Sequence, residues 1–156
     1  MQLKLIPETA SIQRRIAKLK RIVKSYYPLP DKSLIERHTE LLRVFDILKS
    51  KHKDKHPHKK RRVYITRRAL KHIVESRKSQ FTVKHSDTVT IASIFTLLDK
   101  IQEVITDFDF YTFEPPVHIY TKSYPHLGTP FIRVLLDERE DRLEIKTIYY
   151  CRNKNL

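Results

Sequence analysis

The first fifty residues carry apolar side chains at helical spacing. One stripe runs from Ile12 to Tyr26 in alternating steps of four and three residues, and the Pro-Leu-Pro segment at 28–30 ends it. Asp31 or Ser33 can cap a second helix whose apolar side chains could close against this stripe. The apolar positions of the second helix are Leu34, Ile35, Leu41, Leu42, Phe45 and Leu48. We therefore predict a helical hairpin over residues 1–50.

A short strand followed by a helix is predicted from residue 63 onward. Residues 63–66 (Val-Tyr-Ile-Thr) fit the strand, and Thr66 can cap the helix. The buried face of this helix consists of Ala69, Leu70, Ile73 and Val74. His72 then lies on the flank of the helix beside Arg68 and Ser76, at about 100° per residue. This position is that of a histidine bordering a cleft or of an ordinary surface histidine.

The rest of the chain predicts a long helix and a β-meander. Asp87 can cap a helix whose apolar arc is wide enough to be buried against a sheet. From Phe108 the hydrophobic period changes to two, which gives candidate strands at 108–113, 117–122, 131–137 and 142–151. The predicted fold class is α+β, with the N-terminal helical hairpin followed by two helices packed on a four-stranded antiparallel sheet.

The charged tip at 137–142 sets the register that we expect in the last hairpin. Pairing residue 135 with 144 turns Ile132, Val134, Leu136, Leu143, Ile145, Thr147, Tyr149 and Cys151 toward the helices. The opposite face then carries Arg133, Glu144, Lys146 and Tyr150, with Phe131 and Ile148. Cations and aromatic rings on one face suit phosphate contact and base stacking, and a half-covered sheet surface would have the same composition.

Residues 51–62 separate the two predicted units. This segment has no large apolar side chain and concentrates like charges, so we expect a linker and a domain boundary there, with the second domain spanning residues 63–156. His52, His56 and His58 have metal-like spacing, but no cysteine or pair of carboxylates completes a tetrahedral set. We predict no metal and interpret the segment as a basic contact for a polyanion or as a localisation-like signal.

The charge balance indicates the partner. The chain has 156 residues and a formal net charge of +14, which attracts polyanions and favours nucleic acid. A single glycine argues against phosphate-binding loops, and we expect no cofactor. No apolar run approaches the roughly 18 residues that span a bilayer, and the first residues lack the apolar centre of a signal peptide. We expect a protein that is cytoplasmic when made, and export without a cleavable signal is compatible with this sequence.

The order of these segments resembles a known family. The Val-Tyr-Ile-Thr strand at 63–66, the Leu-Lys-His-Ile segment at 70–73, the long apolar helix, and the final strand with Lys-Thr-Ile-Tyr at 146–149 are similar to the phage-associated branch of the barnase/EndoU/colicin/RelE-type ribonucleases (the BECR fold). The resemblance covers residues 63–156. It implies two helices followed by a four-stranded antiparallel sheet, and metal-independent cleavage of RNA by a toxin or growth inhibitor.

The same resemblance implies roles for individual residues. His72 would be the catalytic histidine on the helix, Arg77 the cation that follows it, and Thr147 the hydroxyl of the last strand, with Tyr120 or Lys122 completing the set. A wrong register in the last hairpin would instead move Lys146 into the role of Thr147. Contacts with nucleic acid are expected from the cations Arg68, Lys71, Lys122, Arg133 and Lys146.

These residue types suit cleavage by attack of the 2′-hydroxyl. A base takes the 2′-hydroxyl proton, cations hold the charge of the phosphorane, and an acid protonates the leaving 5′-oxygen, giving a 2′,3′-cyclic phosphate. The expected substrate is RNA, with tRNA among the candidates, and a toxin of this kind would have an immunity or antitoxin protein as partner. Two other classes fit the sequence: a non-catalytic RNA- or DNA-binding module, and a secreted effector that binds a protein partner through its helical hairpin.

Overall fold

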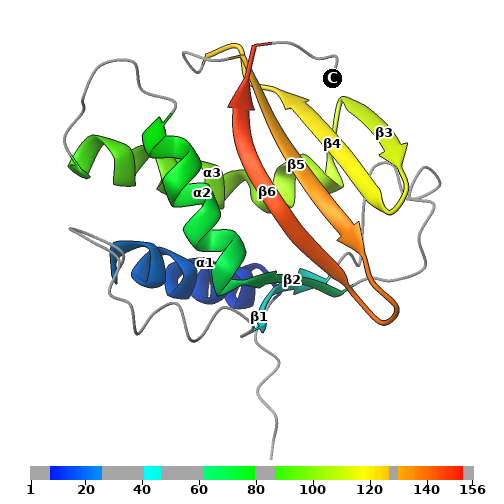
Figure 1. Ribbon diagram of the computed structural model, residues 1–156, viewed down its shortest axis with the longest axis horizontal. Coiled ribbons are helices and arrows are strands. Elements are labelled where there is room, and N and C mark those ends of the chain that lie inside the picture. The colour runs from blue at the N-terminus through cyan, green and yellow to red at the C-terminus, as the bar shows by residue number, and fades with distance from the viewer. Residues whose placement is uncertain (1–7, 26–40, 47–61, 80–86, 127–129, 153–156) are drawn as a thin grey trace, which may run out of the picture.

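The computed structural model describes residues 8–25, 41–46, 62–79, 87–126 and 130–152. Three helices and six strands are present in these ranges (Figure 1). The helices are α1 (Glu8–Ser25), α2 (Arg67–Ser79) and α3 (Asp87–Thr106). The strands are β1 (Leu41–Asp46), β2 (Arg62–Thr66), β3 (Phe110–Glu114), β4 (Val117–Ser123), β5 (Phe131–Glu138) and β6 (Leu143–Cys151).

All six strands form one mixed sheet in the order β1-β2-β6-β5-β4-β3. The last four strands are an antiparallel meander, β1 pairs antiparallel with β2, and β2 pairs parallel with β6. Helix α3 lies behind β4, β5 and β6 in Figure 1, while α1 packs against β1 and α3. The α+β class and the two helices that precede the meander are therefore confirmed, but the sheet has six strands and is mixed rather than four-stranded and antiparallel.

The core lies between the helices and one face of the sheet. Helix α3 contributes the largest share, because six of its side chains are at most 1% exposed: Ile94, Leu97, Leu98, Ile101, Val104 and Ile105. The predicted stripe of α1 is also buried, with Leu19 at 1% and Val23 fully enclosed. Burying one such side chain contributes about 1.5–3 kcal/mol, so the wide apolar arc explains why α3 is central.

The second helix of the predicted N-terminal hairpin is wrong in the part that the structure describes. Residues 41–46 form β1, in which Leu42 and Val44 are buried while Leu41 and Arg43 are exposed. This alternation has a period of two, and a short apolar run can satisfy both periods until a neighbouring strand selects one. Strand β2 provides that neighbour. The segments at 26–40 and 47–61, including the predicted linker and its histidines, lie outside the described residues.

The N-terminal elements share their core with the rest of the chain. Side chains of α1 and β1 belong to the same cluster of buried residues as those of α2, α3 and the meander. Strand β1 also extends the common sheet through β2. Of the segment 51–62 in which we expected a domain boundary, the structure describes only Arg62, the first residue of β2.

The local predictions for the other elements agree closely with the structure. Helix α2 begins directly after Thr66, whose Oγ1 accepts a hydrogen bond from the Ala69 N–H at 3.0 Å, as expected of an N-cap. The four strands of the meander begin and end within two residues of the predicted limits.

The register of the last hairpin differs from the prediction. Leu136 pairs with Ile145 but Leu135 pairs with Thr147, so a β-bulge leaves Lys146 as an extra residue on β6. A bulge reverses the alternation of side chains beyond it. Ile148 and Tyr150 therefore turn toward the helices, where Ile148 is 2% exposed and the Tyr150 hydroxyl donates to the Ser93 carbonyl at 2.8 Å.

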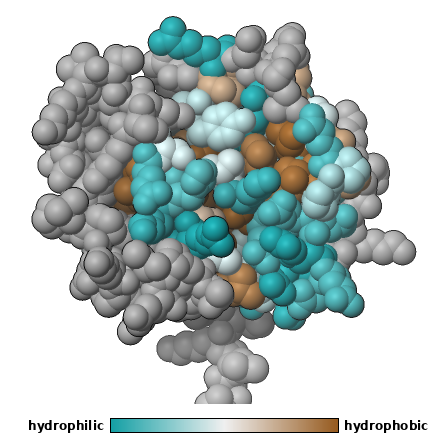
Figure 2. All heavy atoms as spheres, viewed as in Figure 1, coloured by the Kyte–Doolittle hydropathy of each residue, from teal (hydrophilic) through white to brown (hydrophobic). Residues whose placement is uncertain are grey.

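Thr147, Tyr149 and Cys151 consequently lie on the face away from the helices, opposite to their predicted side. Thr147 pairs with Leu135 and Tyr149 pairs with Arg133 on this face. Figure 2 looks onto it and shows hydrophilic and hydrophobic side chains intermingled.

Candidate functional site

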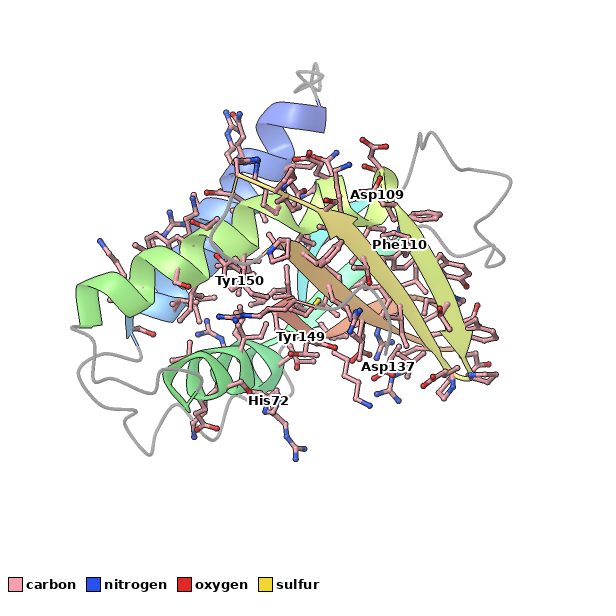
Figure 3. The ribbon with its side chains drawn as sticks, turned by 90° about the horizontal axis from the view of Figure 1, so that it is seen from above. His72, Asp109, Phe110, Asp137, Tyr149 and Tyr150 are labelled. Atoms are coloured by element: carbon pink, nitrogen blue, oxygen red, sulfur yellow. The ribbon has the colours of Figure 1, made fainter. Side chains whose placement is uncertain are left out.

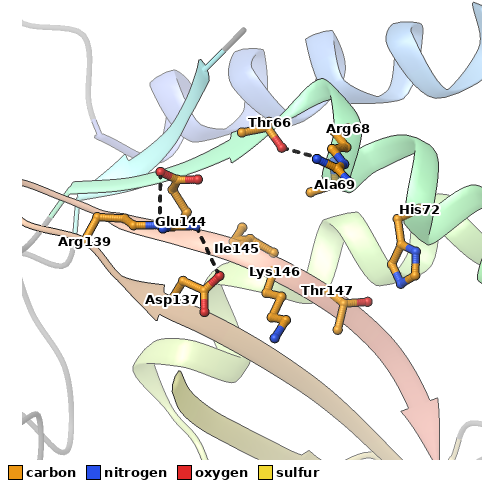
Figure 4. A pocket seen from close by; sticks show the side chains of 10 residues that line it. All are labelled: Thr66, Arg68, Ala69, His72, Asp137, Arg139, Glu144, Ile145, Lys146 and Thr147. Carbon is orange, nitrogen blue, oxygen red and sulfur yellow. Dashed lines mark hydrogen bonds and ion pairs between the residues drawn. The ribbon is translucent and has the colours of Figure 1, made fainter. Parts of the chain in front are cut away.

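A cleft of about 410 Å³ lies between the start of α2 and the β5–β6 hairpin (Figure 4). Its lining combines two parts of the chain that are about 70 residues apart in sequence. The lining residues are Thr66, Arg68, Ala69, His72, Asp137, Arg139, Glu144, Ile145, Lys146 and Thr147. The cleft therefore unites His72, Arg68, Lys146 and Thr147, four of the residues that the sequence singled out.

The topology of the sheet produces this cleft. Of β6, strand β2 pairs only with the first residues, Leu143–Ile145, and after β2 the chain enters α2. Beyond Ile145, β6 therefore has α2 as its neighbour in place of a paired strand. The bulge at Lys146 coincides with this point, and both Lys146 and Thr147 line the cleft as a result. Our alternative roles for these two residues are thus compatible with one site.

His72 is the imidazole of the cleft. It is exposed on the flank of α2, and its Nε2 lies 3.4 Å from the Ser76 Oγ one turn later. Figure 4 shows Lys146 and Thr147 between His72 and Asp137. An accessible imidazole can serve as a general acid or base toward a bound substrate.

Two cations of the cleft are available to an anion. Arg68 and Lys146 are exposed on opposite walls, and neither forms an ion pair with any residue in the described ranges. Lys71 lies on the same helix, but its Nζ is 3.8 Å from a Glu75 carboxylate oxygen. Arg68 and Lys146 are therefore the cations best placed to contact a phosphate.

The carboxylates of the cleft are held by arginines. The Arg139 guanidinium lies 3.7 Å from an Asp137 oxygen and 3.6 Å from the Glu144 Oε2. The same Glu144 oxygen accepts a hydrogen bond from the Arg142 Nε at 2.9 Å and forms an ion pair with the Arg142 Nη2 at 2.9 Å. These contacts offset two negative charges that would otherwise repel a phosphate.

Asp137, Arg139 and Glu144 were missed as site residues by sequence reasoning. Asp137 and Arg139 belong to the charged tip at 137–142 that we used only to set the register, and Glu144 was placed on the face opposite the helices. The signal that could have found them is that Asp137 and Glu144 pair directly across the hairpin, where like charges require nearby cations. The predicted register paired Asp137 with residue 142 and so hid this signal.

Three of the predicted site residues instead stabilise the fold. Tyr120 is fully buried on the helix side of the sheet, with ring centroids of Phe108 and Tyr111 at 5.3 and 5.1 Å. The Lys122 Nζ donates to the Asp107 carbonyl at 2.8 Å and contacts its carboxylate at 3.2 Å, which ties β4 to the end of α3.

Arg133 is the third of these residues. It is 4% exposed, its Nε donates to the Thr121 Oγ1 at 3.0 Å, and its guanidinium lies 5.9 Å from the Tyr149 ring centroid. A buried and hydrogen-bonded arginine is a structural group. Arg77 lies on α2, and its side chain is outside the described part of the structure.

His118 and His126 lie outside the cleft. His118 is 1% exposed on β4, where its Nδ1 is 2.7 Å from the Tyr111 hydroxyl. His126 is exposed after β4, in edge contact with the Tyr124 ring. Burial, followed by the charge of Glu138, raises the pKa of Tyr111 to about 12, so this hydroxyl is neutral at physiological pH.

The Cys151 thiol does not line the cleft. Burial raises the pKa of the Cys151 thiol, with Arg133 opposing that effect, so the thiol is not activated. Among the residues that the structure describes, no three His, Cys, Asp or Glu side chains are grouped so that they could hold a metal ion. Likewise, none of the described helices is long and apolar enough to cross a membrane.

Comparison with known proteins gives no assignment. No protein-family model matches the chain, and neither a curated protein nor a solved structure is significantly similar to it.

Proposed function

We propose that the cleft binds RNA and that the protein is a metal-independent endoribonuclease. The observation that carries the proposal is the cleft itself, in which an accessible imidazole, His72, faces two available cations and a hydroxyl. The net charge of +14 supplies the long-range attraction for a polyanion. The resemblance of residues 63–156 to BECR-type ribonucleases supports the same activity.

The cleft contains each type of group that the proposed reaction needs. His72 exchanges a proton with the reacting oxygens, and Arg68 and Lys146 hold the phosphate as it gains charge. The 2′-oxygen loses its proton and attacks phosphorus, the bond from phosphorus to the 5′-oxygen breaks, and that oxygen is protonated. Thr147 is placed to donate a hydrogen bond to a non-bridging oxygen.

The second proton-transfer group is assigned to Asp137. Its ion pair with Arg139, at 3.7 Å, is looser than the contacts of 2.9 Å that Glu144 makes with Arg142. Asp137 is therefore the less firmly held of the two carboxylates that line the cleft. Asp137 and His72 would then act from opposite ends of the cleft (Figure 4).

A non-catalytic RNA-binding module is the second candidate. The observation in its favour is that both carboxylates of the cleft already contact arginines, which leaves His72 and the Lys146 ammonium as the described lining groups outside an ion pair that could transfer a proton. Such a module would bind RNA through the same cations and leave it intact.

The test combines three substrates and three proteins. Purified protein is incubated in EDTA with total RNA, with a defined RNA oligonucleotide, and with the same oligonucleotide carrying 2′-deoxy residues at the cleavage position. We expect cleavage that leaves a 2′,3′-cyclic phosphate, fails at the 2′-deoxy position, and falls about 10²- to 10⁴-fold in His72→Gln. His126→Gln is the matched control, because His126 is exposed but lies outside the cleft.

The other outcomes separate the candidates. RNA that shifts in a gel but stays intact with every protein would establish the binding module. If His72→Gln cleaves RNA as fast as His126→Gln, the cleft does not take part in the reaction. RNA that is neither bound nor cut would refute both candidates.

We also infer a toxin-like role, which implies an immunity or antitoxin protein as partner. Induced expression of the wild-type chain should arrest the growth of a bacterial host, whereas His72→Gln should not. Arrest by both proteins at equal expression would separate toxicity from the cleft.

A further inference from the structure

Strand β3 is the outer edge of the sheet, on the side away from α2 and the cleft. Its five residues, Phe110–Glu114, pair with β4 in one continuous register without a bulge. No strand in the described ranges pairs with its other side, because β3 is the last strand in the sheet order. Figures 1 and 3 both show β3 and α2 on opposite sides of the sheet, and Figure 3 labels Phe110 and His72 there.

Among the described residues, this edge has none of the usual protection against strand pairing. Natural edge strands carry lysine, proline, a bulge or a covering element, whereas β3 has the sequence Phe-Tyr-Thr-Phe-Glu. Four of its five residues are exposed. Three large hydrophobic residues are exposed in the described part of the chain, and two of them, Phe110 at 38% and Phe113 at 40%, lie on β3.

The backbone of β3 is fixed from its inner side. The Phe113 ring stacks on His118 with centroids 4.4 Å apart, and the Tyr111 hydroxyl is 2.7 Å from the His118 Nδ1. Phe110 packs edge-on against Phe131 at 6.3 Å. An edge that is already held in the extended conformation loses little entropy when another strand joins it.

The charge of this region is opposite to that of the protein. The chain has 32 Lys and Arg residues, yet none lies between positions 101 and 121, which include four carboxylates. Of these four, Glu103 and Asp107 are paired with Lys100 and Lys122, which leaves Asp109, just before β3, and Glu114, the last residue of β3, outside these pairs. Glu114 is exposed and forms no ion pair with any described residue. At 0.15 M salt charges act over about 8 Å, so these two carboxylates set the charge that a ligand meets at the edge.

We propose that the β3 edge binds an extended basic segment of a partner protein by strand addition. The partner's backbone completes the hydrogen bonding of β3, and its alternate side chains contact Phe113 on the helix side and Thr112 on the other. Its cations lie beside Asp109 and Glu114. A second copy of this chain fits less well, because antiparallel pairing of two β3 strands would bring these carboxylates of both copies together.

The probe for this site is a peptide of alternating lysine and valine, about seven residues long so that it spans β3. Two control peptides separate backbone pairing from charge. One has glutamate in place of lysine, and the other keeps the lysines but is N-methylated at alternate amides, so that it loses the donors of one edge. We expect the lysine peptide to bind at least about ten-fold more tightly than either control, and to slow amide hydrogen exchange within residues 110–114.

A matched pair of variants locates the binding. Thr112→Lys places a lysine on the edge, and Gln13→Lys adds the same charge on the exposed side of α1. Thr112→Lys should weaken binding at least about ten-fold, whereas Gln13→Lys should leave it within about two-fold. Both residues are exposed, so both variants should fold, which a thermal melt checks.

Several results would overturn the proposal. If the N-methylated peptide binds as tightly as the lysine peptide, the interaction depends on charge and not on backbone pairing. If amide exchange slows outside β3, the peptide binds at another site. Equal loss in the two variants would remove the edge from the interaction. Protection of β3 that rises with protein concentration in the absence of peptide would assign the edge to a second copy.

Discussion

His72 and His118 carry the same ring in opposite surroundings. His72 is exposed on α2 and its nearest polar contact, to Ser76, is long at 3.4 Å. His118 is 1% exposed, lies 2.7 Å from the Tyr111 hydroxyl, and has the Phe113 ring stacked on it at 4.4 Å. The first histidine can meet a substrate, whereas the second joins β3 to β4.

The same division separates the cations. Arg68 and Lys146 face the cleft, while Lys122 and Arg133 are bound to Asp107 and Thr121 inside the fold. Residue type alone therefore does not distinguish a site from a scaffold. Substitutions in the cleft should change RNA chemistry and leave stability unchanged, and substitutions around β3 and β4 should do the reverse.

The largest expected effect on stability comes from His118→Ala. Removing a buried ring that packs against two aromatic neighbours should lower the free energy of unfolding by about 2–4 kcal/mol. Urea denaturation measures this loss, and His72→Ala should change the same quantity by less than about 0.5 kcal/mol. Equal losses from the two substitutions would contradict the contrast between the histidines.

Lys146→Ala and Lys122→Ala should form a second crossed pair. Lys146→Ala should lower kcat/KM for RNA about 10- to 100-fold, since a charged hydrogen bond to the phosphate contributes about 1.5–3 kcal/mol. The dependence of log K on log salt should become shallower by about one phosphate contact. Lys122→Ala should leave both RNA measurements unchanged and lower stability by about 1 kcal/mol. If the salt dependence of RNA binding changes in Lys122→Ala but not in Lys146→Ala, the RNA binds near Lys122 and not in the cleft, which would contradict our proposal.

Tyr111 makes the β3–β4 region sensitive to alkaline pH. Because burial and Glu138 raise the pKa of Tyr111 from 10.0 to about 12, the folded protein holds this proton more tightly than the unfolded chain. The resulting stability is fully present below pH 10 and is lost as the pH rises toward 12.

Tyr111→Phe tests this pH dependence. The variant should be about 1 kcal/mol less stable than wild type at pH 7, because it loses the hydrogen bond to His118. The gap between the two proteins should narrow steadily above pH 10. A gap that stays constant to pH 11.5 in parallel urea titrations would show that another group controls the alkaline transition.

Local patterns predicted the elements that depend on neighbouring residues. The Thr66 cap, the wide apolar arc of α3 and the period-two strands of the meander were all visible in the sequence and are confirmed. Each of these features is determined by side chains within a few residues, so it does not depend on pairing with distant segments.

Features that depend on pairing between distant segments were not predicted. The apolar run at 41–46 became a strand because β2 lies beside it, and β2 itself pairs with a strand about 80 residues later. The bulge at Lys146 reversed the faces of Thr147 and Tyr150. Tyr120 could not be assigned to the core without knowing which face of β4 meets α3. The bulge in β6 and the orientation of β4 therefore determined which of the predicted site residues meet in the cleft.

The smallest expected effect separates orientation from chemistry within the cleft. Ser76→Ala removes the hydroxyl that lies 3.4 Å from the His72 Nε2, a long contact that holds the ring only weakly. Cleavage should therefore fall only about two- to three-fold, with unchanged affinity for RNA and unchanged stability, because Ser76 touches the ring and not the substrate.

Ser76→Thr, which restores a hydroxyl, is the sharper readout of this contact and should recover the wild-type cleavage rate. A loss of rate that Ser76→Thr does not recover would assign Ser76 to the packing of α2. A loss larger than that of Lys146→Ala would contradict the weak contact and give Ser76 a direct part in the reaction.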